Sequence, residues 1–163
     1  RITDRCNAAW RQWALIASLE SVCITGGREL RGLIMLRMII NNKEHQAEGI
    51  GGIHGLLSSI AQTDDLEIWI SHEGEQSLSA LLNENCGWLM YLRFPEDAGF
   101  SSRNPDRSEQ ASETEVFLLA NGQSDSYPRS WTLERSEVFA AILEFAKSYD
   151  QPKAVAWHDD TMS

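Results

Sequence analysis

Three adjacent residues near the C-terminus have side chains that can bind a metal. On an extended chain, His158 and Asp160 project from one face while Asp159 projects from the other. A zinc site uses at least three protein ligands, and the sequence offers no identifiable third ligand for this pair. The other segment rich in His and Glu, residues 72–75, is better explained as a solvated turn. A metal-dependent enzyme is therefore the functional hypothesis that the sequence supports least, and we expect no bound metal ion.

Two serines and a glycine-rich segment are the other candidates for chemistry. Ser101 and Ser102 do not lie in a Gly-x-Ser-x-Gly elbow, and no spacing of Ser or Cys with His and Asp suggests a nucleophilic site. Residues 49–55, Gly-Ile-Gly-Gly-Ile-His-Gly, lack both the Lys-Ser/Thr ending of a P-loop and the Gly-x-Gly-x-x-Gly spacing of a dinucleotide site. The sequence thus favours a protein that is not an enzyme and needs no cofactor.

The balance of charge differs between the two parts of the chain. Residues 1–37 contain six basic and three acidic residues, whereas residues 38–163 contain eight basic and 21 acidic residues, a net charge of −13. We predict that residues 1–37 are a leader, either upstream sequence before a native start at Met35 or Met38 or a disordered segment, and that residues 38–163 form the domain. The alternative is a native helix over residues 8–22.

Composition also restricts the partners. Residues 38–163 contain no cluster of Lys and Arg of the kind that contacts phosphates, so we do not expect direct nucleic-acid binding. Their acidity would suit a basic partner, although acidic surfaces also keep small proteins soluble. No run approaches the roughly 18 apolar residues of a membrane-spanning helix. Cys6, Cys23 and Cys86 fit neither a zinc site nor a disulfide framework, which favours a cytoplasmic protein.

The hydropathy pattern predicts an α+β domain: a mostly antiparallel sheet of about six strands packed against one long C-terminal helix and one short N-terminal helix. The helices are predicted within residues 49–61 and over 134–149. Asn121-Gly122 predicts a hairpin with a type I′ turn, and residues 95–113 are predicted as a long loop. Strands are predicted where apolar residues alternate or form short runs, over residues 35–40, 65–71, 77–82, 87–94, 115–120, 123–127 and 153–157.

Two acidic regions that contain aromatic residues are the candidate contact surface. The first is the loop over residues 95–113, where Phe100 is an aromatic anchor among acids. The second is the terminus over residues 157–160, together with the exit of the hairpin. The predicted partner-binding residues are Glu96, Asp97, Phe100, Arg103, Asp106, Glu109, Asp125, Tyr127, Trp131, Trp157, His158, Asp159 and Asp160.

The order of these motifs resembles the bacterial polymorphic-toxin immunity family numbered one. The resemblance covers residues 38–160 and rests on Gly-Trp-Leu-Met-Tyr-Leu-Arg-Phe at 87–94, Gly-Phe-Ser-Ser-Arg-Asn-Pro at 99–105, the Asn-Gly hairpin, the long helix and the terminal Trp-His-Asp-Asp. It implies a cytoplasmic inhibitor that binds a cognate secreted toxin domain, often a nucleic-acid deaminase, without catalysis. A toxin of this kind carries a cationic groove, which would attract an acidic protein. The alternative is a general acidic protein-interaction or ligand-binding module.

Overall fold

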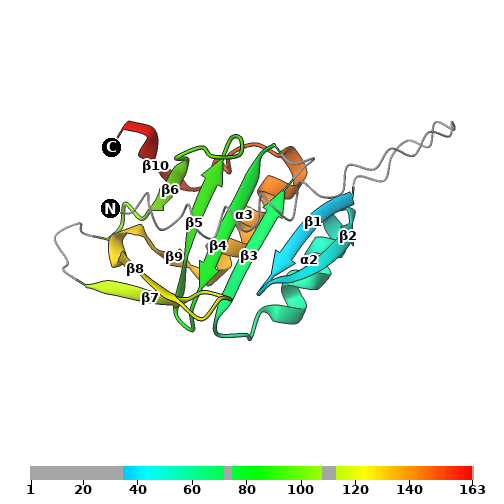
Figure 1. Cartoon of the computed structure of the whole chain (residues 1–163), viewed down its shortest axis with the longest axis horizontal. Helices are drawn as coiled ribbons and strands as arrows, with labels where there is room; N and C mark the ends of the chain where they lie inside the picture. The colour runs from blue at the N-terminus through cyan, green and yellow to red at the C-terminus, as the bar shows by residue number, and fades with distance from the viewer. Residues whose placement is uncertain (1–34, 72–74, 108–112, 163) are drawn as a thin grey trace, which may run out of the picture.

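The computed structural model describes residues 35–71, 75–107 and 113–162, and these residues form an α+β fold with a mostly antiparallel sheet and two helices (Figure 1). The elements are β1 (Met35–Ile40), β2 (Lys43–Glu48), α2 (Gly49–Ile60), β3 (Leu66–Ser71), β4 (Ser77–Leu82), β5 (Cys86–Leu92), β6 (Phe100–Arg103), β7 (Thr114–Leu118), β8 (Ser124–Pro128), β9 (Leu133–Glu134), α3 (Arg135–Ser148) and β10 (Ala156–Asp159), with 3-10 turns at Arg129–Trp131 and Asp160–Met162. The main sheet has the strand order β10-β6-β5-β4-β3-β1-β2, with β9 paired to β5, while β7 and β8 form a separate hairpin.

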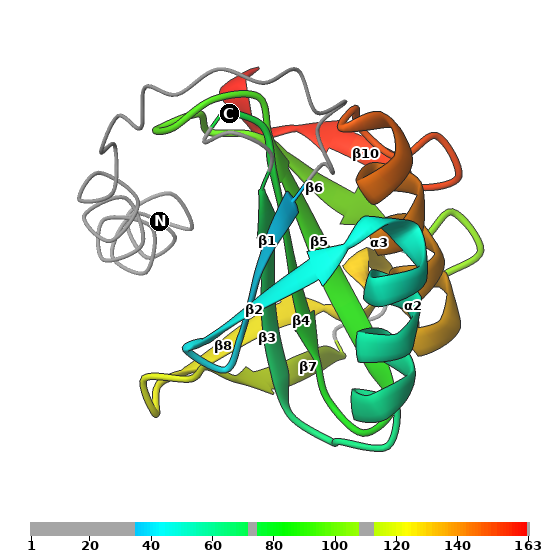
Figure 2. The same cartoon turned by 90° about the vertical axis from the view of Figure 1, so that its right-hand side faces the viewer.

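Both helices cover the same face of the main sheet (Figure 2). Because side chains alternate along a strand, every second residue of β3, β4 and β5 points to this face. Ile68 and Leu89 of the sheet pack there with Ile53 of α2 and with Ile142 and Phe145 of α3. All five side chains are almost completely buried, so this layer is the larger hydrophobic core.

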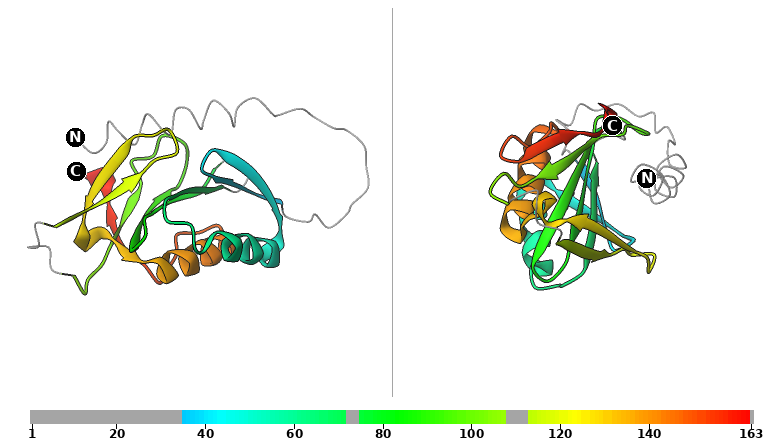
Figure 3. Two further views of the ribbon diagram at one scale, coloured as in Figure 1. Left: turned by 90° about the horizontal axis from the view of Figure 1, so that it is seen from below. Right: turned by 90° about the vertical axis from the view of Figure 1, so that its left-hand side faces the viewer.

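The hairpin formed by β7 and β8 lies on the opposite face of the sheet (Figure 3). Its Phe117 and Tyr127 pack against Trp69, Leu81 and Trp88 of the sheet. The rings of Tyr127 and Trp88 are stacked, with centroids 4.1 Å apart and planes 9° apart. The central strand β5 is therefore covered on both faces, which accounts for a sequence that is apolar at nearly every position.

A buried carboxylate also joins the hairpin to the sheet. Glu67 of β3 accepts a hydrogen bond from the backbone N–H of Ala120 at 2.8 Å and another from Nε1 of Trp69 at 3.0 Å. These bonds satisfy both carboxylate oxygens where little water reaches them, as a buried charged group requires. Together with the aromatic stack, they fix the position of the hairpin over the sheet.

The turn chemistry differs from the prediction at one hairpin. Gly122 has a φ of 84°, but Asn121 is not in the left-handed region, so the predicted type I′ turn is wrong. Instead, Gly122 N–H donates to Leu119 O and Leu119 N–H donates to Gln123 O, which gives a longer connection with a left-handed glycine. Two consecutive residues with positive φ occur at a different turn, between β1 and β2, where φ is 46° at Asn41 and 64° at Asn42.

The predicted count of about six strands was too low, because ten strands are present in the described residues. The strand β2 was missed because it is an exposed edge strand in which only Ala47 is buried, so it has no apolar alternation. The predicted loop over 95–113 contains β6. The strand predicted to reach Phe94 ends at Leu92, and the final strand begins at Ala156 rather than at Lys153.

The predicted leader and the alternative helix over residues 8–22 lie outside the described residues, except that residues 35–37 begin β1. In the part of the chain that the structure describes, no helix has the length and apolar character needed to cross a membrane.

Candidate functional site

The pairing of β6 with β10 brings the two predicted contact regions together. Phe100 lies opposite Asp159, and Ser101 lies opposite His158. Beyond the strands, the backbone N–H of Asp160 donates to the carbonyl of Gly99 at 3.0 Å. The loop before β6 and the end of β10 therefore form one end of the molecule, although about 60 residues separate them in the sequence.

The loop before β6 is held by an ion pair. Asp97 accepts hydrogen bonds from Nε of Arg93 at 2.8 Å, from Nη2 of Arg93 at 2.7 Å and from the Arg93 backbone N–H at 3.0 Å. The Asp97 side chain is only 1% exposed. Hydrogen bonds from Arg93 lower the pKa of the Asp97 carboxyl below its usual value. Asp97 therefore stabilises the loop and presents almost no surface to a partner.

Gly99 ends the same loop, at a position that no larger residue can occupy without a clash. Its φ is 77°, in the left-handed region, and a Cβ at this position would lie 2.7 Å from the carbonyl oxygen of Tyr91. Only glycine combines this backbone conformation with so close an approach. A larger residue at position 99 would therefore distort the loop that joins Arg93 to β6.

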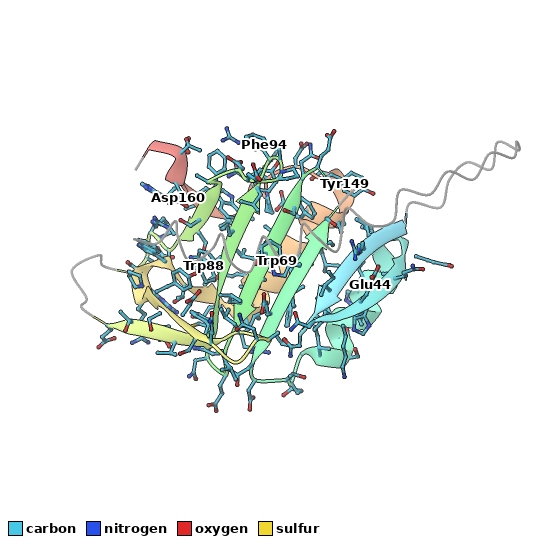
Figure 4. The ribbon with its side chains drawn as sticks, in the orientation of Figure 1. Glu44, Trp69, Trp88, Phe94, Tyr149 and Asp160 are labelled. Carbon is cyan, nitrogen blue, oxygen red and sulfur yellow. The ribbon has the colours of Figure 1, made fainter. Side chains whose placement is uncertain are left out.

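Three exposed and two half-buried side chains at this end define a surface that we call the apical patch: exposed Phe94, Glu96 and His158, and half-buried Asp159 and Asp160. Phe94 is 51% exposed, and the Arg93 guanidinium carbon lies 5.6 Å from the centroid of its ring. Figure 4 shows Phe94 and Asp160 at the same end of the sheet. Thr161 donates to the Asp159 carboxylate from its hydroxyl and its backbone N–H, which lowers the pKa of Asp159.

Phe94 was not among the predicted contact residues, because the pattern of 87–94 assigned it to a strand face. The signal that could have corrected this is Pro95, since a proline cannot continue the hydrogen bonding of a central strand. Phe100, the predicted anchor, is half-buried and lies 6.2 Å from the ring of Tyr91, which belongs to the larger core. The exposed aromatic residue at this end is thus Phe94 rather than Phe100.

Arg103 joins the terminus to the hairpin exit, two regions whose proximity the sequence left open. Its guanidinium carbon lies 3.8 Å from the ring centroid of Trp131, and its Nη2 lies 4.0 Å from Oδ1 of Asp160. Its Nη1 donates to the hydroxyl of Ser101 and to the carbonyl of Ser102, both at 2.8 Å. Arg103 and Trp131 therefore form a half-buried bridge beside the apical patch.

Three further predicted residues have contacts inside the fold. Tyr127 is 4% exposed, within the stack on Trp88, and its hydroxyl donates to half-buried Asp125 at 3.4 Å. Trp157 packs against the larger core and donates from Nε1 to the carbonyl of Pro152 at 2.7 Å. These contacts position the strands β8 and β10.

Of the last two predicted residues, Asp106 and Glu109, the structure describes only Asp106. Asp106 is exposed and follows β6, whereas Glu96 precedes it, so the strand separates these two acids along the chain. Glu109 lies outside the described residues. The predicted loop is therefore divided by β6.

The geometry around His158 offers little to a metal ion. Its Nε2 lies 3.8 Å from Oδ1 of Asp160, but the positively charged Arg103 lies beside the same carboxylate. Within residues 35–71, 75–107 and 113–162, no three His, Cys, Asp or Glu side chains are grouped to hold a metal. Burial raises the pKa of the free thiol of Cys86.

The arginines and several of the acidic side chains differ in how the fold uses them. Each arginine in the described ranges contacts another group of the chain: Arg37 binds Glu44, Arg93 binds Asp97, Arg107 binds Glu134, Arg129 binds Glu113, Arg103 packs on Trp131 and Arg135 binds backbone carbonyls. Exposed Glu96, Asp64, Asp65 and Glu84 take part in no ion pair within the described residues. The surface therefore presents unneutralised carboxylates, which can bind a cationic partner.

Comparison with protein families gives a match over residues 36–159, to the family described as Immunity protein Imm1. The matched span runs from β1 to the last residue of β10 and includes every residue of the apical patch except Asp160. Among curated proteins, none matches the chain.

Proposed function

The chain belongs to the Imm1 family of immunity proteins, and from this membership we propose that it binds and neutralises a cognate toxin domain in the bacterial cytoplasm. An immunity family implies a toxin partner. We further propose that the toxin acts on nucleic acid, as a deaminase or a nuclease, and that inhibition is by occlusion rather than by catalysis. The family match is the observation that carries this proposal.

The charge of the domain supports a toxin that acts on nucleic acid. Such a toxin needs a cationic surface to neutralise phosphates. Residues 38–163 have a net charge of −13, and the described arginines are engaged within the fold. An acidic protein of this kind is attracted to the cationic groove over a Debye length, about 8–10 Å at physiological ionic strength. Once bound, it excludes the nucleic-acid substrate from the same groove.

We propose that the apical patch takes part in this attraction. Exposed Glu96 and half-buried Asp159 and Asp160 place three carboxylates at the same end of the molecule as the exposed ring of Phe94. An aromatic residue surrounded by charged groups is a common arrangement in protein interfaces, where the charges favour encounter and the ring provides contact area.

The experiment that tests the function is co-expression in bacteria of the full chain with the toxin domain encoded beside it. We expect the full chain to restore growth and to co-purify with the toxin domain. The control is Ile142→Asp, which places a carboxylate at a completely buried position and should prevent folding and rescue.

Failure of the well-folded chain to bind the toxin domain or to restore growth would reject the pairing. Rescue without binding would reject occlusion, because a protein that acts by occlusion must remain on its target while the toxin is inactive.

A further inference from the structure

The outer face of the β7–β8 hairpin carries two of the three large hydrophobic side chains that are exposed in the described residues. Val116 is 55% exposed and Leu118 is 47% exposed. They occupy alternate positions of β7, so they project from the same face, and they lie opposite exposed Ser126 and Ser124 of β8. Because serine side chains are short, Val116 and Leu118 protrude from this face as an apolar ridge.

The hairpin holds this ridge in a fixed orientation. Phe117, between the two exposed residues, is completely buried against the sheet, and Tyr127 of β8 is stacked on Trp88. Glu67 holds the backbone of Ala120 beyond the end of β7. A contact surface that is already ordered loses less conformational entropy when a partner binds.

The charge of the hairpin and of the domain indicates the chemistry of the partner. Residues 113–128 contain Glu113, Glu115 and Asp125 and no Lys or Arg. The alternation that places Val116 and Leu118 on the outer face places Glu115 and Asp125 on the face of Phe117 and Tyr127, so these acids border the ridge and are not part of it. Arg129 lies 2.7 Å from Glu113 and 3.7 Å from Glu115, so residues 113–129 keep a net charge of −2, within a domain of net charge −13. A second copy of this chain would bring like charges together, whereas a basic surface would be attracted.

We infer that the outer face of the β7–β8 hairpin, centred on Val116 and Leu118, is the short-range contact surface for the toxin domain. This inference rests on the proposed function and assigns to the toxin an apolar depression on a surface of net positive charge. The apical patch and the net charge accelerate encounter, and the ridge slows dissociation, because buried apolar contacts act mainly on the dissociation rate.

The contact is made by side chains rather than by addition of a strand to the hairpin. The strand β7 pairs only with β8 among the described strands, so its outer edge has no strand partner there. However, Nδ2 of Asn83 donates to the carbonyl of Val116 at 3.1 Å and occupies the middle of that edge. The side chains of Val116 and Leu118, unlike this edge, are exposed in the described structure.

The test measures the binding kinetics of the full chain and of the double variant Val116→Thr, Leu118→Thr with the toxin domain encoded beside it. Threonine keeps strand propensity and removes apolar surface at exposed positions, so folding should be retained. We expect the dissociation rate to rise about tenfold or more, with little change in the association rate. The control Phe94→Ser removes an exposed apolar side chain at the apical patch and should raise dissociation less.

Each result has a separate meaning. Absence of binding by the unchanged chain would overturn the proposed function and, with it, this inference. Binding by the unchanged chain with the same dissociation rate in a folded double variant would overturn the inference alone. Dimerisation of the unchanged chain in sedimentation, lost in the double variant, would assign the face to self-association and would also overturn it.

Discussion

At the scale of single residues, Asp97, which was predicted to bind a partner, has a carboxylate that is engaged by Arg93 within the fold. Its carboxylate accepts three hydrogen bonds from Arg93 and is almost inaccessible to solvent. These bonds favour the charged form, so the pKa of Asp97 is lower in the folded than in the unfolded protein. The stabilisation is therefore complete above the unfolded pKa and is lost as the pH falls through the folded pKa.

Replacement of Asp97 by Asn should lower the free energy of unfolding at neutral pH by about 2 kcal/mol, since the hydrogen bonds lose their charge. The difference from the unchanged protein should shrink as the pH falls through the folded pKa of Asp97. Denaturant unfolding at a series of pH values measures it. The control Glu96→Gln alters an adjacent exposed acid and should change stability by less than about 0.5 kcal/mol. A difference that stays constant with pH would contradict this explanation.

At the scale of elements, Arg135 joins three segments that are distant in the sequence. From the start of α3, its guanidinium donates to the carbonyls of Ala61 and Thr63 after α2 at 3.1 and 2.7 Å. It also donates to the carbonyl of Asp64 at 3.1 Å and to that of Asn83 between β4 and β5. These carbonyl oxygens lie in loops, outside the hydrogen-bonded strands of the sheet. One side chain therefore supplies the donors that several loop residues need.

Replacement of Arg135 by Met should therefore lower the free energy of unfolding by about 2–3 kcal/mol, because several carbonyls lose a charged donor at once. Arg129→Met is the matched control. Arg129 pairs with exposed Glu113 on the surface, so this change should cost less than about 1 kcal/mol. Thermal or denaturant unfolding compares the two variants, and equal losses would show that Arg135 has no special role at this junction.

At the scale of the whole molecule, the excess of negative charge influences the encounter with a partner more than any single ion pair does. The described arginines are engaged with groups of the same chain, whereas acids such as Glu84, Glu96 and Asp64 remain exposed. The net charge of −13 over residues 38–163 therefore produces a negative electrostatic potential around the domain. A field of this sign raises the rate at which a basic partner is encountered.

The rate of association with the toxin domain should consequently fall about tenfold between low salt and about 0.5 M salt, with a much smaller change in the dissociation rate. Stopped-flow or surface-based kinetics measures both rates. Glu96→Lys should lower association more than Glu48→Lys, which makes the same change of charge at the exposed end of β2. Equal effects would indicate attraction by the total charge without a preferred contribution from the apical patch.

Much of the fold could be predicted because local patterns reflect burial. Alternation located β3 and β4, a run that is apolar on both faces located most of β5, and helical spacing located α2 and α3. The strand β2 could not be found in this way, since an exposed edge strand leaves most of its side chains in water. The candidate contact residues were harder to assign, because composition identifies Glu96 and Asp97 equally, while only the position of Arg93 makes one exposed and the other inaccessible.

The sequence by itself determined the α+β class, the central strand covered on both faces and the acidic character of the domain, because these depend on residue type and on spacing along the chain. The resemblance of its motifs also indicated the immunity family that the match over residues 36–159 shows. The tertiary structure decided which side chains remain available to a partner. In the folded protein, Tyr127 is buried in the stack on Trp88, whereas Phe94, Val116 and Leu118 are exposed. Exposure depends on what packs against each residue from distant parts of the chain, and no local pattern contains that information.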